Sequence, residues 1–154
     1  MSPYILAFLI GVVAGLRALT APAAVSWAAR IGWLNLENTW LAFLGFAATP
    51  YILSLLAIGE LINDKLPKTP SRKAPPSFAV RLLSGALCGA AVGATDQALV
   101  GGLMAGVLGA AAGTLGGYEF RARLVRATGG NDLPIALLED AIAIGSAFFI
   151  ASRF

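Results

Sequence analysis

Five long apolar stretches, separated by short polar segments, dominate the 154-residue chain. A helix of about 20 apolar residues crosses the ~30 Å hydrocarbon core of a bilayer. The pattern therefore predicts an all-α fold, a polytopic transmembrane helical bundle of about five spans that forms one domain over residues 1–154. The predicted spans cover residues 3–29, 40–61, 78–95, 98–118 and 133–152.

The first predicted span begins with Ser2-Pro3, which pairs a capping hydroxyl with a proline suited to the first helical turn. It is long for a single crossing, and a kink or an interruption is predicted near its middle. The residues that indicate this interruption are Gly15, Arg17, Thr20 and Pro22.

The second predicted span has Asn38 or Thr39 as its cap and a second kink at Thr49-Pro50. It is followed by the segment 65–77, whose four prolines predict an extended, exposed loop. The last span follows an Asn131-Asp132 cap.

Composition places the chain in the lipid bilayer. It is 58% hydrophobic and only 12% charged, with a mean hydropathy of +0.79, whereas about a quarter of the residues in soluble domains are charged. The net charge of +3 does not indicate nucleic-acid binding, because the basic residues lie at the ends of apolar segments without interleaved aromatic residues. The single cysteine, Cys88, is interpreted as a small packing residue, and the chain has no histidine.

The positive charges predict an orientation. Seven Lys and Arg residues lie between the second and third spans or between the fourth and fifth, an eighth, Arg81, lies near the start of the third span, and only Arg30 and Arg153 lie on the other side. By the positive-inside rule, the N-terminus is expected in the cytoplasm and the C-terminus outside. The alternative is a signal peptide over residues 4–16, but no basic region precedes it and the apolar stretch continues beyond it.

Glycines recur at intervals of four in the first, third and fourth spans. Small residues with this spacing let helix backbones approach closely in lipid. Packing within the bundle is the favoured interpretation, and a homodimer through the glycine-rich faces is the alternative. The glycines concerned are Gly11, Gly15, Gly85, Gly89, Gly93, Gly102, Gly106, Gly109, Gly113 and Gly117.

Ionisable residues inside apolar spans are candidates for function, because each is costly at membrane depth unless it faces a partner or water. Arg17 lies in the first span, and Glu139 and Asp140 lie in the last. Helical periodicity places Asp140 on a face of alanines and Arg17 on a face of small residues that includes Thr20, so both side chains are expected to point into the bundle. The two adjacent carboxylates are expected to point in different directions.

Two interpretations of this polar centre, Arg17, Thr20, Glu139 and Asp140, remain open. In the first, Arg17 forms a structural salt bridge with one carboxylate and fixes only the helix register. In the second, the carboxylate left over after Arg17 is paired titrates or binds an ion or a polar head group. The second is favoured, because a buried ion pair often stabilises no better than an apolar replacement.

A second acidic set, Glu60, Asp64 and Glu119, is predicted at the cytoplasmic boundary. Glu60 and Asp64 share a helix face, and such oxygens are able to bind a divalent cation. Pairing with Lys65 and neighbouring arginines is the favoured interpretation. No catalytic residue, metal ligand or cofactor is predicted.

Three segments of the chain hold distinctive motifs: a Gly-Leu-Arg triplet at residues 15–17, a Glu-x-x-x-Asp-Lys-x-Pro segment at residues 60–67, and the Glu139-Asp140 pair. With these motifs the chain resembles the bacterial membrane proteins grouped as the domain-of-unknown-function 4126 family. The likeness extends over essentially the whole chain. It implies a small integral protein of the bacterial inner membrane, but it implies no activity, because the family has none assigned.

Three classes of function remain. The favoured one is a transporter or channel-like protein whose buried Arg, Glu and Asp residues handle a proton, an ion or a small polar solute. The alternative is a non-catalytic membrane assembly protein with a structural salt bridge. A lipid-modifying enzyme is disfavoured, because no nucleophile or phosphotransfer motif accompanies the acidic residues.

Overall fold

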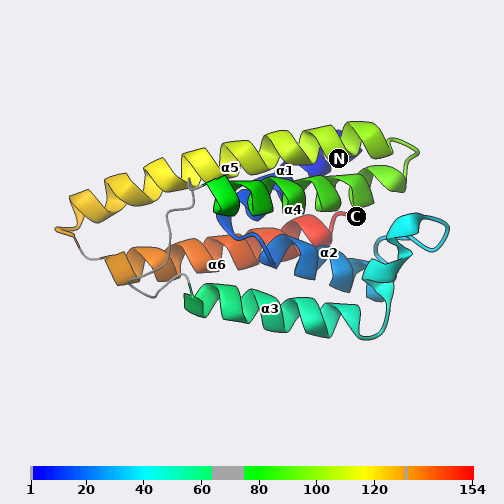
Figure 1. The fold of residues 1–154 in the computed structure, drawn as a ribbon, viewed down its shortest axis with the longest axis horizontal. Coiled ribbons are helices and arrows are strands. Elements are labelled where there is room, and N and C mark those ends of the chain that lie inside the picture. The colour runs from blue at the N-terminus through cyan, green and yellow to red at the C-terminus, as the bar shows by residue number, and fades with distance from the viewer. Residues whose placement is uncertain (1, 64–74, 131) are drawn as a thin grey trace.

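The structure is a computed structural model that describes residues 2–63, 75–130 and 132–154. Within these ranges every regular element is helical (Figure 1). The elements are α1 (Pro3–Leu16), α2 (Thr20–Arg30), the 3-10 helix η1 (Trp40–Gly45), α3 (Thr49–Asn63), α4 (Pro75–Ala94), α5 (Leu99–Ala127) and α6 (Asp132–Ala151).

Three helices are long and apolar enough to cross a membrane, over Pro76–Ala94, Leu99–Ala127 and Leu133–Ala151. Two shorter apolar helices, α1 and α3, accompany them. The predicted helical bundle is therefore confirmed for the described parts of the chain, but the prediction of about five spans is not.

The first predicted span consists of two helices that turn back on each other. Helix α1 ends at Leu16 and α2 begins at Thr20, so the chain is interrupted at residues 17–19, where the sequence predicts a break. From this break both helices extend toward the same end of the bundle (Figure 1). We call α1, the break and α2 the hairpin, and residues 17–19 its tip.

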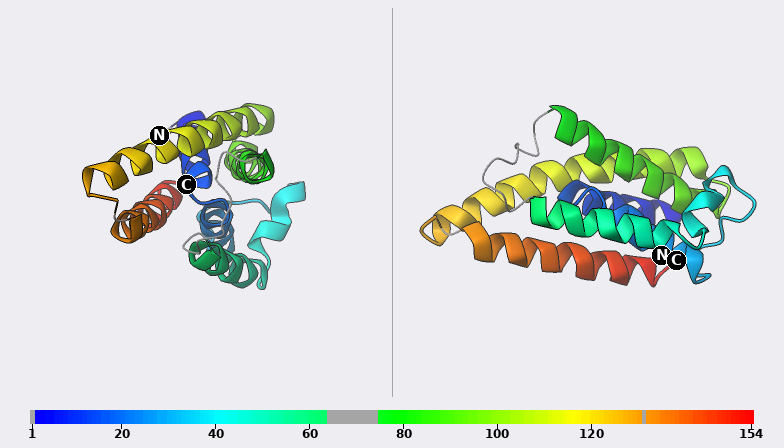
Figure 2. Two further views of the ribbon diagram at one scale, coloured as in Figure 1. Left: turned by 60° about the vertical axis from the view of Figure 1, so that its left-hand side comes forward. Right: turned by 60° about the horizontal axis from the view of Figure 1, so that its bottom comes forward.

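The two arms of the hairpin are shorter than a membrane crossing. At 1.5 Å per residue, the 14 residues of α1 and the 11 residues of α2 extend for about 21 Å and 17 Å, less than a ~30 Å hydrocarbon core. Neither arm is therefore long enough to cross such a core by itself. Both termini lie at the same end of the bundle (Figures 1 and 2), whereas five crossings would put them at opposite ends.

The second predicted span also differs in the structure. Residues 40–45 form η1, which is capped by Thr39, whose hydroxyl accepts from the Leu41 amide at 3.2 Å. Helix α3 begins at Thr49, so Thr49-Pro50 starts a helix and does not kink one. Proline suits a first turn, because the amide it lacks would have no partner there.

Helices α4 and α5 extend beyond their predicted limits. Helix α4 begins at Pro75, so the prolines at 75 and 76 belong to its first turn and not to an extended loop. The rest of that predicted loop lies outside the described residues. Helix α5 continues to Ala127, so three arginines expected in a loop lie on its last turns: Arg121, Arg123 and Arg126.

Glycines pack α1, α4 and α5 backbone against backbone. A Cβ atom added at Gly106 would lie closer than 3.0 Å to backbone atoms of Gly85 and Gly89 in α4. The same holds for Gly109 and Gly113 against α1. These glycine faces are therefore occupied within the chain, as the favoured interpretation expects.

Helices α2, α3 and η1 form a second group, which packs through side chains. Ser26 of α2 donates a hydrogen bond to the carbonyl of Leu44 in η1. Trp27 of α2 donates through Nε1 to Ser54 Oγ of α3 at 2.9 Å and meets the ring of Tyr51 edge-on, with centroids 5.1 Å apart. Helix α6 contacts α1 and α5 of the first group, which also includes α4, and α2 of the second group. The hairpin tip lies where they meet.

Candidate functional site

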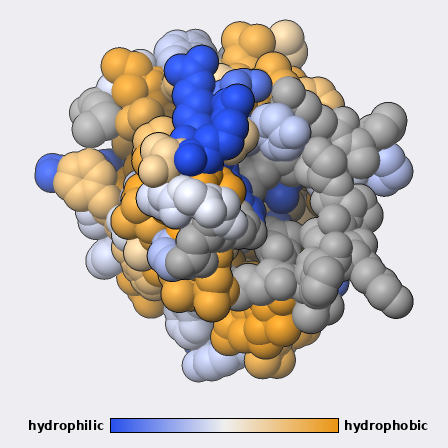
Figure 3. Space-filling model, turned by 90° about the vertical axis from the view of Figure 1, so that its left-hand side faces the viewer, coloured by the Kyte–Doolittle hydropathy of each residue, from blue (hydrophilic) through white to orange (hydrophobic). Residues whose placement is uncertain are grey.

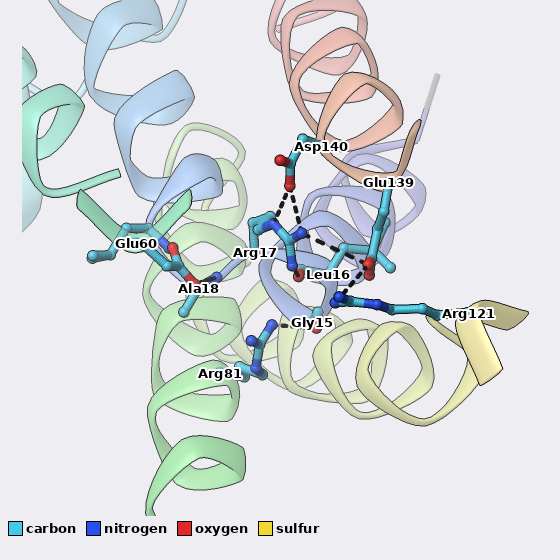
Figure 4. A network of polar contacts seen from close by, with 10 residues as sticks. Gly15, Leu16, Arg17, Ala18, Glu60, Arg81, Arg121, Glu139 and Asp140 are labelled. Atoms are coloured by element: carbon cyan, nitrogen blue, oxygen red, sulfur yellow. Dashed lines mark hydrogen bonds and ion pairs between the residues drawn. The ribbon is translucent and has the colours of Figure 1, made fainter. Parts of the chain in front are cut away.

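The hairpin tip exposes backbone groups that no helix satisfies. The last carbonyls of α1 and the first amides of α2 have no partner within their own helices. Irregular backbone at membrane depth is tolerated only where it is buried in protein or lines a water-filled cavity. Side chains from α3, α4, α5 and α6 converge on this segment (Figure 4).

Arg17 lies at the centre of these contacts and is fully buried. Its Nε donates to Asp140 Oδ1 at 2.7 Å, and its Nη2 donates to the same oxygen. Its Nη1 donates to the carbonyl of Leu16 at 3.1 Å, at the end of α1. One guanidinium therefore joins α6 to the end of α1.

Asp140 takes its place on the alanine face of α6, where Ala136, Ala143 and Ala147 are all buried. The small side chains let α6 approach the hairpin closely enough for the carboxylate to meet Arg17. The structure thus brings together the two residues whose pairing the helical periodicity makes plausible.

Glu139 also reaches Arg17, although the two carboxylates were expected to point in different directions. Its Oε2 lies 3.7 Å from Arg17 Nη2 and 3.5 Å from Arg121 Nη1. The longer Glu side chain bends back to the guanidinium, and Arg121 is near because α5 continues as a helix beyond its predicted end. The surplus carboxylate expected from the sequence is therefore paired with a second arginine.

Glu60 belongs to the hairpin tip and not to a boundary cluster. Its Oε1 accepts from the Ala18 amide and its Oε2 from the Leu19 amide, both at 2.7 Å. Leu19 is the N-cap of α2 and supplies no side-chain cap, so a carboxylate from α3 takes that role. The local signal for this contact is a helix start without a capping residue.

The other members of the predicted boundary set do not extend this site. Glu119 is exposed on α5, and Asp64 lies outside the described residues. Over residues 2–63, 75–130 and 132–154, no group of three or more His, Cys, Asp or Glu side chains is placed to hold a metal ion.

Three residues at the tip were missed in the sequence. Arg81 of α4 is 4% exposed and donates through Nη1 to the Gly15 carbonyl at 2.7 Å. Ser84 of α4 donates to the Ala18 carbonyl, and Thr114 Oγ1 of α5 lies 3.3 Å from the Gly15 carbonyl. Arg81 lies almost two turns into an apolar helix, and this position is the signal that could have identified it.

Thr20 begins α2 directly after the two amides that Glu60 binds. The residue is 8% exposed, and its Oγ1 has no hydrogen-bond partner in the described part of the chain. A buried hydroxyl without a partner is costly, which makes this position a candidate for contact with a ligand or water.

Three arginines and three carboxylates meet around the tip. Arginines 17, 81 and 121 are set against the carboxylates of Glu60, Glu139 and Asp140. We call the end where α5 stops and α6 starts the basic end, after the arginines on α5. Figure 3 shows this end, with hydrophilic side chains on its surface and hydrophilic surface again inside a hollow near its middle.

Comparison with known proteins adds no assignment: no family model, curated protein or solved structure matches the chain. The resemblance to the domain-of-unknown-function 4126 proteins therefore stays a prediction, and the function has to be argued from the site.

Proposed function

We propose that this chain is a transporter or channel-like protein of the bacterial inner membrane that handles a proton, an ion or a small polar solute. The observation that carries the proposal is the hairpin, whose non-helical tip lies among six charged side chains. Transporters commonly build their substrate sites from discontinuous helices, with helix ends and unwound backbone at the midplane.

The charge arrangement supports this function. Arg17 is shared between Asp140 and Glu139, and Glu139 is shared between Arg17 and Arg121. A change of protonation or an incoming ion at one member of this chain alters the balance at the next, because charges interact strongly where water is excluded. Coupling of this kind is what a carrier of charge requires.

We further propose that the basic end faces the cytoplasm. Positive charges are retained on the cytoplasmic side during insertion, and the arginines of α5 lie at this end. With the hairpin in place of a first span, both termini are then outside the cytoplasm. This orientation replaces the cytoplasmic N-terminus inferred from five spans.

One observation favours the alternative, a non-catalytic assembly protein. Arg17, Glu60 and Asp140 are all partnered, as they would be in a structural network that only holds the hairpin together. A homodimer of such a protein would use helical glycines with open space around them, such as Gly59, Gly116 and Gly145.

Flux measurements separate the two functions. We would reconstitute wild type, Asp140→Asn and Arg17→Gln in liposomes and follow proton and cation flux with entrapped dyes. The matched control is Asp96→Asn, which changes an exposed carboxylate far from the tip. Folding of every variant is checked by gel filtration and thermal unfolding.

The proposal expects wild-type flux that falls at least tenfold in folded Asp140→Asn and Arg17→Gln and persists in Asp96→Asn. Absence of flux in wild type, together with loss of stability in the two tip variants, would make the charges structural. Equal flux in all four proteins would place any pathway elsewhere.

A further inference from the structure

The carboxylate of Glu60 sits where an anion binds at the start of a helix. Its two oxygens accept one amide each, from Ala18 and Leu19, at 2.7 Å. Helix N-termini attract anions because their free amides and the helix dipole both favour negative charge. Here the anion is a side chain of α3, a helix separate from the hairpin (Figure 4).

Thr20 provides a second, independent indication of a ligand at this position. Its hydroxyl is more than nine-tenths buried and has no partner among the residues described. Thr20 is the first residue of α2 and directly follows Ala18 and Leu19, whose amides hold Glu60, so the unpartnered hydroxyl belongs to the same helix start. An anion bound there would accept a hydrogen bond that Glu60 does not take.

Glu60 is not fully enclosed by the protein. Glu60 is half-buried, in contrast to the fully buried Arg17. The hollow at the basic end contains hydrophilic surface (Figure 3), and α5 places Arg121, Arg123 and Arg126 at this end. Positive charge around an entrance raises the local concentration of anions.

We propose that the start of α2 is an anion site, that Glu60 is its displaceable internal occupant, and that the ligand is a small planar oxyanion such as a carboxylate. The carboxylate class follows from the two-pronged contact, in which adjacent amides each bind one oxygen of a planar group. This inference rests on the proposed function and names the substrate class of the same site. Glu60 then closes the path until an entering anion takes its two amides.

Nitrate flux tests this site directly. Nitrate has the planar oxygens of a carboxylate and stays charged at neutral pH, so it does not cross lipid as a neutral acid. Glu60→Ala removes the occupant, and Glu119→Ala is the matched control, because it removes an exposed carboxylate from α5 without freeing any amide of the hairpin. We expect nitrate flux at least tenfold faster through Glu60→Ala than through Glu119→Ala or wild type.

A helix cap with a purely structural role predicts the opposite, since its removal destabilises the fold and opens no path. Folded Glu60→Ala with nitrate flux no faster than Glu119→Ala would overturn the inference. If Glu60→Ala does not fold, Glu60→Gln replaces it, and the same comparison with Glu119→Ala decides. If neither variant folds, nitrate flux and nitrate-induced thermal stabilisation are measured on wild type. The absence of both would overturn the inference.

Thr20→Val provides a further test, because the rate of nitrate flux would not change if Thr20 had only a structural role. It replaces the hydroxyl with a methyl group of similar shape, so stability is expected to stay the same or rise. Combined with Glu60→Ala, it should slow nitrate flux severalfold, and an unchanged rate would remove Thr20 from the site. Proton or cation flux in wild type without nitrate flux in any variant would leave the proposed function standing and refute only the anion site.

Discussion

The ion pair between Arg17 and Asp140 should make the two residues strongly dependent on each other for stability. The perturbation is Asp140→Asn, which keeps the shape of the side chain and removes its charge. Arg17 stays charged in any environment, is fully buried and loses its nearest anion. The remaining anion, Glu139, lies 3.7 Å from Nη2 and is shared with Arg121.

The structure sets the expected magnitude. Removing one partner of a buried ion pair costs about 3–5 kcal/mol, because the other charge stays buried. Since Glu139 compensates in part, we expect a loss near the lower end, ~3 kcal/mol, which is roughly a hundredfold or more in the folding equilibrium. Arg17→Met should cost about as much, because it leaves Asp140 and Glu139 side by side with one fewer cation.

The double variant Arg17→Met/Asp140→Asn provides the decisive comparison. With both charges gone, the cost should be well below the sum of the two single losses, and the coupling energy should be about 2–3 kcal/mol. Unfolding is measured in mixed micelles with increasing fractions of dodecyl sulfate. The control, Asp96→Asn, should change the free energy of unfolding by less than ~0.5 kcal/mol, because that residue is exposed.

Additive losses would refute the reasoning. If the double variant were as unstable as the sum of the single variants, Arg17 and Asp140 would stabilise the fold independently. The ion pair would then not be what joins α6 to the hairpin.

Two further predictions follow from the packing and the path of the chain. Gly106→Ala should lower the free energy of unfolding by about 1–3 kcal/mol, because the added Cβ meets the backbone of α4. Gly116 has open space around it, so Gly116→Ala should be neutral or stabilising by up to ~1 kcal/mol, and thermal unfolding measures both variants. Cysteines introduced at Ser2 and Ser152 should both react with a membrane-impermeant maleimide from outside, while one introduced at Arg123, at the basic end, should not. The native Cys88 is buried and should give no background labelling. Labelling of positions 2 and 152 from opposite sides would contradict the hairpin.

The sequence predicted the elements whose signals are local. The Ser2-Pro3 start, the interruption around Arg17 and the alanine face that carries Asp140 all appear in the structure. Each depends on residues within a few turns of one another, so a helical wheel and the known helix breakers suffice to find them.

The direction of the chain after Arg17 could not be predicted in this way. A kinked span and a hairpin have the same apolar pattern, and the difference is decided by distant partners. Glu60 holds the start of α2 from more than 40 residues along the chain, and Arg81 and Thr114 hold the end of α1 from other helices. Because Glu60 lies beside a basic segment, its sequence context indicated a surface position.

The two arms of the hairpin are held by different kinds of contact, which has a consequence for how the site opens. Helix α1 lies against α5 with glycine backbones in contact, and the Gly15 carbonyl near its end is contacted by Arg81 and Thr114. Contacts of this kind leave no room for movement without breaking the packing. Helix α2 lies against α3 and η1 through side chains, and side chains repack with changes of rotamer.

The start of α2 is therefore the less constrained side of the tip. Glu60 binds this start from α3, so displacing its carboxylate breaks the link between α2 and α3 at the tip and leaves the α1–α4–α5 packing intact. Arg17 keeps its hydrogen bonds to Leu16 and Asp140 throughout, since neither involves α3. A path that opens at Glu60 thus requires no change in the ion pair, and this separates the anion site from the Arg17–Asp140 pair within a single polar centre.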